Sequence, residues 1–474
     1  MTIASGLRWV AVSQGVRVGS QIFSLVVLSR LLPPHAYGLI GMAMTVTNLA
    51  FMFRDLGTMI TIVQRPHLTA SLTNTLFWIN AGLAVAIFFA MLLSAAPLAG
   101  AYREPALAAI VCALATCIPI SSLGAVQQAL MERQSAFRRL AGIEGISAVA
   151  GVVTAVVLAF NNHGAWSLVG QMLVATAVAA ALSCRASDWR PQWRFDLTEL
   201  RDISGFTTHY AAFQFASYLQ KNADAAVIGY AIGSVALGLY AMASKILLFP
   251  LQNISGIATR VLIPALSRRQ HNLVEVSALY LRANTAIVLL LSPVLTLLFY
   301  LRYPIVDVVL GPRWHAAADL FVWLVPAGFV QAVHAPAQAT LVALGKAGPL
   351  FKLSLFNTVS QIACIAIGSQ WGLNGAACGL LVASIIVFAP TLMIACQSLN
   401  INFHAFFNGY ARPVLATLAM LLVLQIVDAS GVPRASGTYG YCTLQIMAAA
   451  GSYLFVLLVL LRVGASDLRS LFRP

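Results

Sequence analysis

Apolar runs separated by short polar stretches recur from one end of the chain to the other. A helix needs about 20 consecutive apolar residues to cross the hydrocarbon core of a bilayer, so each run predicts a membrane span. The predicted spans number fourteen and cover 8–31, 37–64, 72–97, 106–131, 141–160, 164–184, 203–230, 236–262, 283–301, 316–344, 349–369, 373–397, 409–428 and 439–461. The pattern predicts an all-α polytopic membrane protein.

A short internal repeat indicates how the spans are grouped. Residues 36–43 read AYGLIGMA and residues 236–243 read ALGLYAMA, with five of eight positions identical at an offset of 200 residues. The two copies mark the turn from the first span to the second and from the seventh to the eighth. An even number of crossings separates them, which predicts lobes related by an axis along the membrane normal. We predict six-helix lobes at 1–190 and 200–398, followed by two further transmembrane helices in 399–474.

Composition supports a membrane protein without a soluble domain. Of the 474 residues, 60% are hydrophobic and only 9% are charged, whereas soluble domains carry about 25% charged residues. The seven cysteines show no CxxC or Cys/His spacing, so the sequence predicts neither a metal site nor a cofactor.

The net charge of +14 would suit nucleic-acid binding, but the arrangement of the charges argues against it. Of the 28 Lys and Arg residues, four lie within predicted spans, five fall on one side of the membrane and nineteen on the other. This asymmetry follows the positive-inside rule and predicts that both termini are cytoplasmic. The basic residues are therefore interpreted as topology signals at the ends of spans.

Four cationic side chains interrupt the predicted spans: Arg17, Arg54, Lys221 and Lys245. A cation at the centre of a membrane helix costs about 2.5–3.5 kcal/mol even on lenient insertion scales. Such residues face protein or a water-filled cavity. We therefore predict a hydrated cationic cavity between helices, suited to an anionic passenger such as a diphosphate.

Polar side chains spaced three and four residues apart accompany these cations and are expected to line the same cavity. The predicted lining residues are Gln14, Gln21, Asn48, Gln214, Gln252, Gln331, His334 and Gln338. The alternative interpretation is ordinary hydrogen bonding between neighbouring helices.

Three acids also lie within predicted spans: Asp55, Glu144 and Asp224. Ionisable residues at this depth are candidates for coupling transport to protons or sodium ions. Lys221 and Asp224 are i,i+3 neighbours, so a local salt bridge between them is the competing interpretation. Both interpretations stay open from the sequence.

Catalytic motifs are missing from the sequence. It contains no GxSxG, HExxH or P-loop pattern and no acidic metal cluster. The predicted outside face also lacks a large hydrophilic loop of the kind that membrane polymerases and ligases use. The sequence therefore predicts a transporter and not an enzyme.

Short segments between the first span and about residue 400 follow a characteristic order. They are LSRLL at 28–32 with YGL at 37–39, DLG at 55–57 with IVQR at 62–65, ALMER at 129–133 with Phe137, RVLIP at 260–264, and GPRW at 311–314. In this order and spacing the chain resembles the Wzx-type flippases of the polysaccharide transporter family, especially exporters of exopolysaccharide repeat units. Their superfamily also holds multidrug exporters and the lipid II flippase.

The resemblance implies a specific passenger and location. It implies that an undecaprenyl-diphosphate-linked oligosaccharide is moved from the cytoplasmic to the periplasmic leaflet of the bacterial inner membrane by alternating access. It also implies membrane lipid, a polysaccharide polymerase and a chain-length regulator as partners. The alternatives are a drug/cation antiporter or a lipid II flippase on the same fold, and a membrane-embedded polymerase or ligase.

Overall fold

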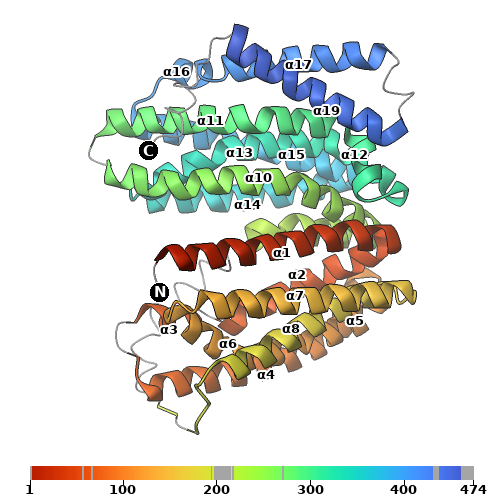
Figure 1. Ribbon diagram of the computed structural model, residues 1–474, viewed down its shortest axis with the longest axis vertical. Coiled ribbons are helices and arrows are strands. Elements are labelled where there is room, and N and C mark those ends of the chain that lie inside the picture. The colour runs from red at the N-terminus through yellow and green to blue at the C-terminus, as the bar shows by residue number, and fades with distance from the viewer. Residues whose placement is uncertain are drawn as a thin grey trace. The chain divides into compact units, whose positions relative to one another are not determined.

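The structure is a computed structural model that describes residues 3–55, 58–65, 68–193, 195–196, 215, 218–269, 272–430 and 437–460 (Figure 1). Its described regular elements are all helical, which confirms the predicted all-α class. Contacts between Cα atoms divide the chain into two compact units, 1–238 and 239–474. The lobes predicted at 1–190 and 200–398 and the appendix at 399–474 stay a prediction.

The first unit contains eight helices with assigned bounds and a helical stretch at 218–231. The eight are α1 (Ile3–Leu31), α2 (Pro34–Asp55), α3 (Thr58–Gln64), α4 (Ala70–Tyr102), α5 (Ala106–Ala115), α6 (Cys117–Arg133), α7 (Phe137–Phe160) and α8 (Trp166–Ala186). One cluster of buried apolar side chains lies where α3, α4 and α6 meet, and includes Ile62, Leu76 and Val126.

Two predicted spans of this unit are each built from two helices. The run at 37–64 breaks after α2, and the Asp55 carboxylate accepts hydrogen bonds from the Met59 amide at 3.2 Å and the Thr58 hydroxyl at 3.3 Å. Such a carboxylate satisfies donors that a new helix leaves free at its first turn. The run at 106–131 is similarly divided at Thr116, between α5 and α6.

Helices α7 and α8 form a close antiparallel hairpin. A Cβ added at Gly151 would lie 2.7 Å from the carbonyl oxygen of Gln171, so only glycine permits this approach. Small residues at such crossings are how membrane helices gain packing contacts where hydrocarbon offers no hydrophobic driving force.

The second unit contains a layer of long helices that run beside one another (Figure 1). They are α10 (Ser234–Arg268), which begins in the first unit, α11 (Leu273–Tyr300), α13 (Phe321–Ala343), α14 (Ala347–Gly368) and α15 (Gly372–Leu399). Shorter elements connect them: α12 (Arg302–Val309), the 3₁₀ helices η1 (Pro312–Leu320) and η2 (Ser369–Trp371), and α16 (Phe403–Asn408). The core of this unit includes Tyr280, Val333 and Phe406.

Close backbone contact recurs in the hairpin of α14 and α15. A Cβ at Gly379 would lie 2.2 Å from the Cys364 carbonyl oxygen, and one at Gly368 would lie 2.2 Å from the Gly375 oxygen. The fifth and sixth predicted spans of each lobe therefore form hairpins of the same kind.

The last two helices, α17 (Ala411–Ala429) and α19 (Gly437–Phe455), pack on α11. The Tyr453 hydroxyl of α19 donates to the Leu289 carbonyl at 2.8 Å. The oxygen of that hydroxyl also lies 3.1 Å from the Ser292 hydroxyl oxygen. These polar groups satisfy one another inside an otherwise apolar contact.

Eleven stretches of the described residues are long and apolar enough to cross a membrane. One of them, 348–399, covers both α14 and α15. Helix α1 and the stretch at 218–231 correspond to the first and seventh predicted spans. The chain is therefore a multi-pass membrane protein, and the count of fourteen spans stays a prediction.

Candidate functional site

The repeat detected in the sequence corresponds to a reciprocal contact inside the first unit. A Cβ added at Gly38 would lie 1.7 Å from the Ser234 carbonyl oxygen. A Cβ added at Gly238 would lie 2.0 Å from the Pro34 carbonyl oxygen. In each copy of the repeat, the glycine contacts the residue that lies four positions before the glycine of the other copy. This reciprocity is what a pseudo-twofold axis requires.

Polar contacts tie together the loops at this end of the crossing. The Ser234 hydroxyl donates to one oxygen of the Glu104 carboxylate. The other oxygen of Glu104 lies 3.4 Å from the His35 Nε2. By the predicted topology all three residues lie at the outer face, so this Glu104 cluster (His35, Glu104 and Ser234) holds the outer ends of the two repeats together.

Arg54 lies in the last turn of α2, in a pocket between α2, α6 and α8. Its Nη1 donates to the Ser121 hydroxyl at 2.5 Å, and its guanidinium lies 5.7 Å from the Phe51 ring centroid. The cavity has a volume of about 360 Å³ and is also lined by Gln128 and Thr176. Among the described residues, the buried Nε of Arg54 has no hydrogen-bond partner.

The unpaired Nε–H of Arg54 is able to donate a hydrogen bond to an anion. A guanidinium presents five N–H donors in a fixed fork that matches the oxygens of a carboxylate or phosphate. An unsatisfied buried donor costs about 1–3 kcal/mol. The Arg54 pocket therefore offers an unused N–H to an anionic group or to water.

Lys221 lies on the helical stretch at 218–231, which packs on α2 within the first unit. The Tyr218 hydroxyl donates to the Thr45 carbonyl, and the rings of Phe53 and Phe215 lie 5.9 Å apart. One turn further along, the Lys221 side chain is exposed.

The predicted alternative for Lys221 is a local salt bridge with Asp224. The Asp224 carboxylate accepts a hydrogen bond from the Ala225 amide at 2.8 Å. An exposed lysine in a membrane helix faces water or protein. A place for Lys221 in the cavity and a local salt bridge with Asp224 both stay predictions.

A second pocket lies in the second unit between α10 and α13. It has a volume of about 310 Å³ and contains two predicted lining residues, Gln252 and Gln331, together with Ser255. Gln331 also donates to the Ser384 hydroxyl of α15 at 3.4 Å. Lys245 is exposed on α10, two turns before Gln252.

Other predicted residues lie apart from these pockets. His334 is buried, with its ring 5.8 Å from that of Phe388. Gln338 and Asn48 are half-buried, and Gln21 is exposed. Gln214 and the side chains of Gln14 and Arg17 lie outside the described residues. The convergence of the cations on one shared cavity stays a prediction.

The three predicted coupling acids have different surroundings. Asp55 accepts the hydrogen bonds that start α3, so its carboxylate already has a structural role. Asp224, three residues after Lys221, is half-buried. Glu144 is exposed on α7. No group of three or more metal-ligating side chains occurs in the part of the chain that the structure describes.

Several polar residues of the site were not singled out from the sequence. Ser121 and Gln128 lie on α6 and Thr176 lies on α8, and most residues of both spans are apolar. The adjacent amides of Gln127 and Gln128 inside an apolar run are the one signal that marks this region.

Several described proteins are similar in sequence to this chain over most of its length. It is 26% identical to the lipopolysaccharide biosynthesis protein WzxC of Escherichia coli (strain K12), over 81% of this chain and 78% of that protein. It is 25% identical to the succinoglycan biosynthesis transport protein ExoT of Rhizobium meliloti (strain 1021), over 97% and 93%. With the teichuronic acid biosynthesis protein TuaB of Bacillus subtilis (strain 168) it shares 26% identity over 96% and 95%.

Solved structures show the same fold. The lipid II flippase MurJ in an inward closed conformation matches with a TM-score of 0.78 and 12% identity, over 96% of this chain and 99% of that one. An inward-facing multidrug resistance transporter of the MATE family matches with a TM-score of 0.62 and 14% identity, over 83% and 98%. The chain therefore has the fold of these flippases and exporters, as predicted.

The family comparison covers the first unit and the start of the second. Residues 27–319, more than half of the chain, match the family described as "Polysaccharide biosynthesis protein". The matched region contains the glycine crossing, the Arg54 pocket, Lys221 and Lys245. The chain belongs to this polysaccharide biosynthesis protein family.

Proposed function

We propose that this protein flips an undecaprenyl-diphosphate-linked oligosaccharide from the cytoplasmic to the periplasmic leaflet of the bacterial inner membrane. A diphosphate with attached sugars cannot cross hydrocarbon without partners for its charges and hydroxyl groups. Family membership and the flippase fold support the class of activity. The lipid-linked passenger and its direction belong to the proposal.

The observation that carries the proposal is the surroundings of the cations. Arg54 lines a pocket with an unused N–H, and Lys221 and Lys245 are exposed within predicted membrane spans. Cations held this way suit the diphosphate, and the amides of Gln252 and Gln331 suit sugar hydroxyls. The polyprenyl tail stays in the lipid phase.

Alternating access supplies the movement. The reciprocal glycine contact is a point where the backbones of the two repeats touch, and the Glu104 cluster holds their outer ends together. Rocking of one lobe against the other about this contact opens the cavity to one face at a time. With Asp55 engaged in starting α3, Asp224 and Glu144 are the candidates for coupling to a proton or sodium gradient.

The test is reconstitution of the full-length protein in vesicles with a fluorescent polyprenyl-diphosphate disaccharide as the probe. Quenching of outer-leaflet fluorescence measures the rate of flipping. Arg54→Gln and Lys221→Gln are expected to reduce that rate at least about tenfold, because each removes a charge-assisted contact worth about 1.5–3 kcal/mol. Arg282→Gln, an exposed arginine of α11, is the control and should flip like the parent protein.

Other results would lead to other functions. Wild-type flipping by both cavity variants would remove the cationic-cavity mechanism. Flipping of a lipid II analogue in place of the disaccharide probe would favour a lipid II flippase. Drug export without flipping would indicate an antiporter, and turnover of the sugar chain by purified protein would indicate a polymerase or ligase. In cells, the proposal predicts that a polysaccharide polymerase and a chain-length regulator act with this protein.

A further inference from the structure

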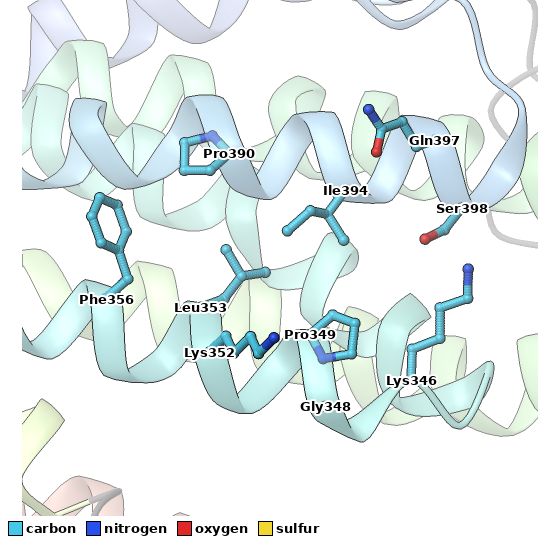
Figure 2. Close-up of a pocket in the computed structure, with 10 residues that line it drawn as sticks. All are labelled: Lys346, Gly348, Pro349, Lys352, Leu353, Phe356, Pro390, Ile394, Gln397 and Ser398. Carbon is cyan, nitrogen blue, oxygen red and sulfur yellow. The ribbon is translucent and has the colours of Figure 1, made fainter.

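The hairpin of α14 and α15 contains a pocket that the proposed transport cycle does not use (Figure 2). It has a volume of about 870 Å³ and opens where α14 begins and α15 ends. Figure 2 shows the Lys346 side chain rising toward Gln397 and Ser398 of α15. Lys352, one and a half turns further along α14, lines the same pocket.

The rest of this pocket is apolar. Leu353 and Phe356 of α14 face Pro390 and Ile394 of α15 (Figure 2). Lys346 and Lys352 are exposed, and within the described chain neither forms an ion pair. The pocket thus has a cationic part at the end of the hairpin and an apolar part that continues along it.

The hairpin of α7 and α8 contains a pocket of the same design. Its volume is about 1000 Å³, and it lies where α7 begins and α8 ends. Its cations are Arg138, Arg139 and Arg185, and its apolar side chains are Ile143, Ile146 and Leu182. Arg139 donates to the Ala186 carbonyl at 3.2 Å, which joins the two ends of the hairpin.

The two pockets occupy equivalent places in the two predicted lobes. Each lies in the hairpin of the fifth and sixth spans, at the end where the fifth begins. Six predicted spans separate the starts of α7 and α14, so both ends face the same side of the membrane. The predicted topology places that side in the cytoplasm, where anionic lipid gives the leaflet a negative surface potential.

We propose that each pocket binds one phospholipid with an anionic headgroup from the cytoplasmic leaflet. The Lys or Arg side chains hold the phosphate, and an acyl chain lies along the apolar side chains of the hairpin. Basic pockets between membrane helices on the cytoplasmic side are known to bind such headgroups. The proposal is independent of the passenger and adds two lipid sites that recur with the pseudo-symmetry of the fold.

The two-part lining distinguishes a lipid from a free phosphate. A soluble phosphate would contact only the Lys and Arg side chains. Neither pocket has an acidic side chain among its described lining residues. An exposed apolar surface beside those cations, with Phe356 44% and Ile146 57% exposed, suits a hydrocarbon chain. Phosphatidylglycerol, which carries both a phosphate and acyl chains, is therefore the probe.

The test is native mass spectrometry of the purified full-length protein titrated with phosphatidylglycerol or with phosphatidylcholine. Two tightly bound phosphatidylglycerol molecules per chain are expected, and phosphatidylcholine should bind more weakly. Lys346→Gln/Lys352→Gln should weaken one of the two by roughly 10- to 30-fold, as expected for two interfacial cations. Arg138→Gln/Arg185→Gln should weaken the other, and the combined variant should retain neither.

Matched variants separate this site from general charge effects. Arg268→Gln/Arg282→Gln removes two exposed cations from α10 and α11 and should leave both lipids bound. Phe356→Ala keeps the charges of the α14 pocket and should weaken phosphatidylglycerol there several-fold. Glycerol 3-phosphate, which lacks acyl chains, should not displace the lipid at equal concentration.

Three results would overturn the proposal. The first is equal loss of lipid in the Arg268→Gln/Arg282→Gln control, which would indicate a nonspecific charge effect. The second is equal binding of phosphatidylcholine, and the third is displacement by equimolar glycerol 3-phosphate, which would indicate a soluble-phosphate site. None of these depends on flipping, so the proposal and the proposed function fail separately.

Discussion

The two repeats share a backbone contact but differ in their charges. At the crossing, Gly38 and Gly238 have equivalent surroundings, each against a carbonyl of the other repeat. The cations have no such equivalents. At the offset of 200 residues, Arg17 corresponds to Ser217, Lys221 to Gln21, Lys245 to Thr45 and Arg54 to Ile254.

This difference separates two kinds of constraint. A close backbone approach admits glycine alone, so both copies retain it. A cation acts through its charge at a given depth, so one copy can supply it for both if the two repeats line one cavity. The asymmetry of charge on a symmetric framework is therefore what a shared passenger site predicts.

The largest effect is expected at the shared contact. Gly38→Ala would place a methyl group within 1.7 Å of the Ser234 carbonyl oxygen, which the backbone cannot accommodate without moving a helix. We expect a loss of more than about 3 kcal/mol of folding free energy, measured by equilibrium unfolding in detergent. Gly82→Ala is the matched control, because nothing lies within 4 Å of its added Cβ.

That control should unfold at the same free energy or slightly higher, since alanine favours a helix by about 1 kcal/mol over glycine. Equal stability of the Gly38→Ala and Gly82→Ala variants would contradict the close contact at the crossing.

The next effect tests whether charge is shared between the repeats. Lys221→Gln should slow flipping at least about tenfold, as argued from the loss of a charge-assisted contact. Restoring a lysine at the equivalent position, in Gln21→Lys/Lys221→Gln, should return the rate to near that of the parent protein. The measurement is fluorescence quenching of the polyprenyl-diphosphate probe in vesicles.

Lys221→Gln combined with Phe23→Lys is the matched control, since exposed Phe23 lies two residues from Gln21 on another face of α1. Rescue by this control alone, or by neither variant, would argue against one cavity lined by both repeats.

A smaller effect is expected at the Glu104 cluster. Glu104→Ala removes the acceptor for Ser234 and the partner of His35. Hydrogen bonds to a charged group contribute about 1.5–3 kcal/mol, so the outward-open population should rise by roughly tenfold or more. The rate at which a membrane-impermeant maleimide labels Gln21→Cys from the outside, in a cysteine-free background, measures this population.

Arg103→Ala, at the exposed neighbouring residue, should leave the labelling rate unchanged. Faster labelling in Arg103→Ala than in Glu104→Ala would show that the cluster does not hold the outer face closed.

The smallest effect concerns a part of the molecule outside the predicted repeat. Tyr453→Phe deletes the hydroxyl that bonds the Leu289 carbonyl and Ser292 beside α11. We expect a loss of about 1 kcal/mol of unfolding free energy and an unchanged flipping rate. A change in flipping without a change in stability would indicate that α17 and α19 take part in transport.

Some features of the fold were accessible from the sequence and others were not. The repeat around Gly38 and Gly238 was detected from five matching residues, and its structural meaning is the contact that those glycines make. The interruption of the span at 37–64 was not predicted, because Arg54 and Asp55 are only two adjacent charged residues in a long and largely apolar run. Its role became visible only from the amide of Met59 and the hydroxyl of Thr58.

In the candidate site too, some features were predicted from the sequence and others became visible only in the structure. Arg54 was expected to face the protein interior because a cation in lipid is costly. Its hydrogen-bond partner Ser121 and the pocket residue Gln128 were not predicted, since they come from α6, more than 60 residues away. Likewise Gln252 and Gln331 were each expected to line a cavity, but only the packing of α10 on α13 shows that they share one pocket.

By itself, the sequence determined the membrane class and the helical nature of the spans, and it predicted the sidedness of the charges. These depend on the transfer of each segment between water and hydrocarbon, which is a sum over neighbouring residues. Only the tertiary structure decided which glycines touch, which donor of Arg54 is unused and where cations lie beside apolar grooves. Those features depend on contacts between helices distant in the chain, where a few tenths of an ångström decide whether two backbones can meet.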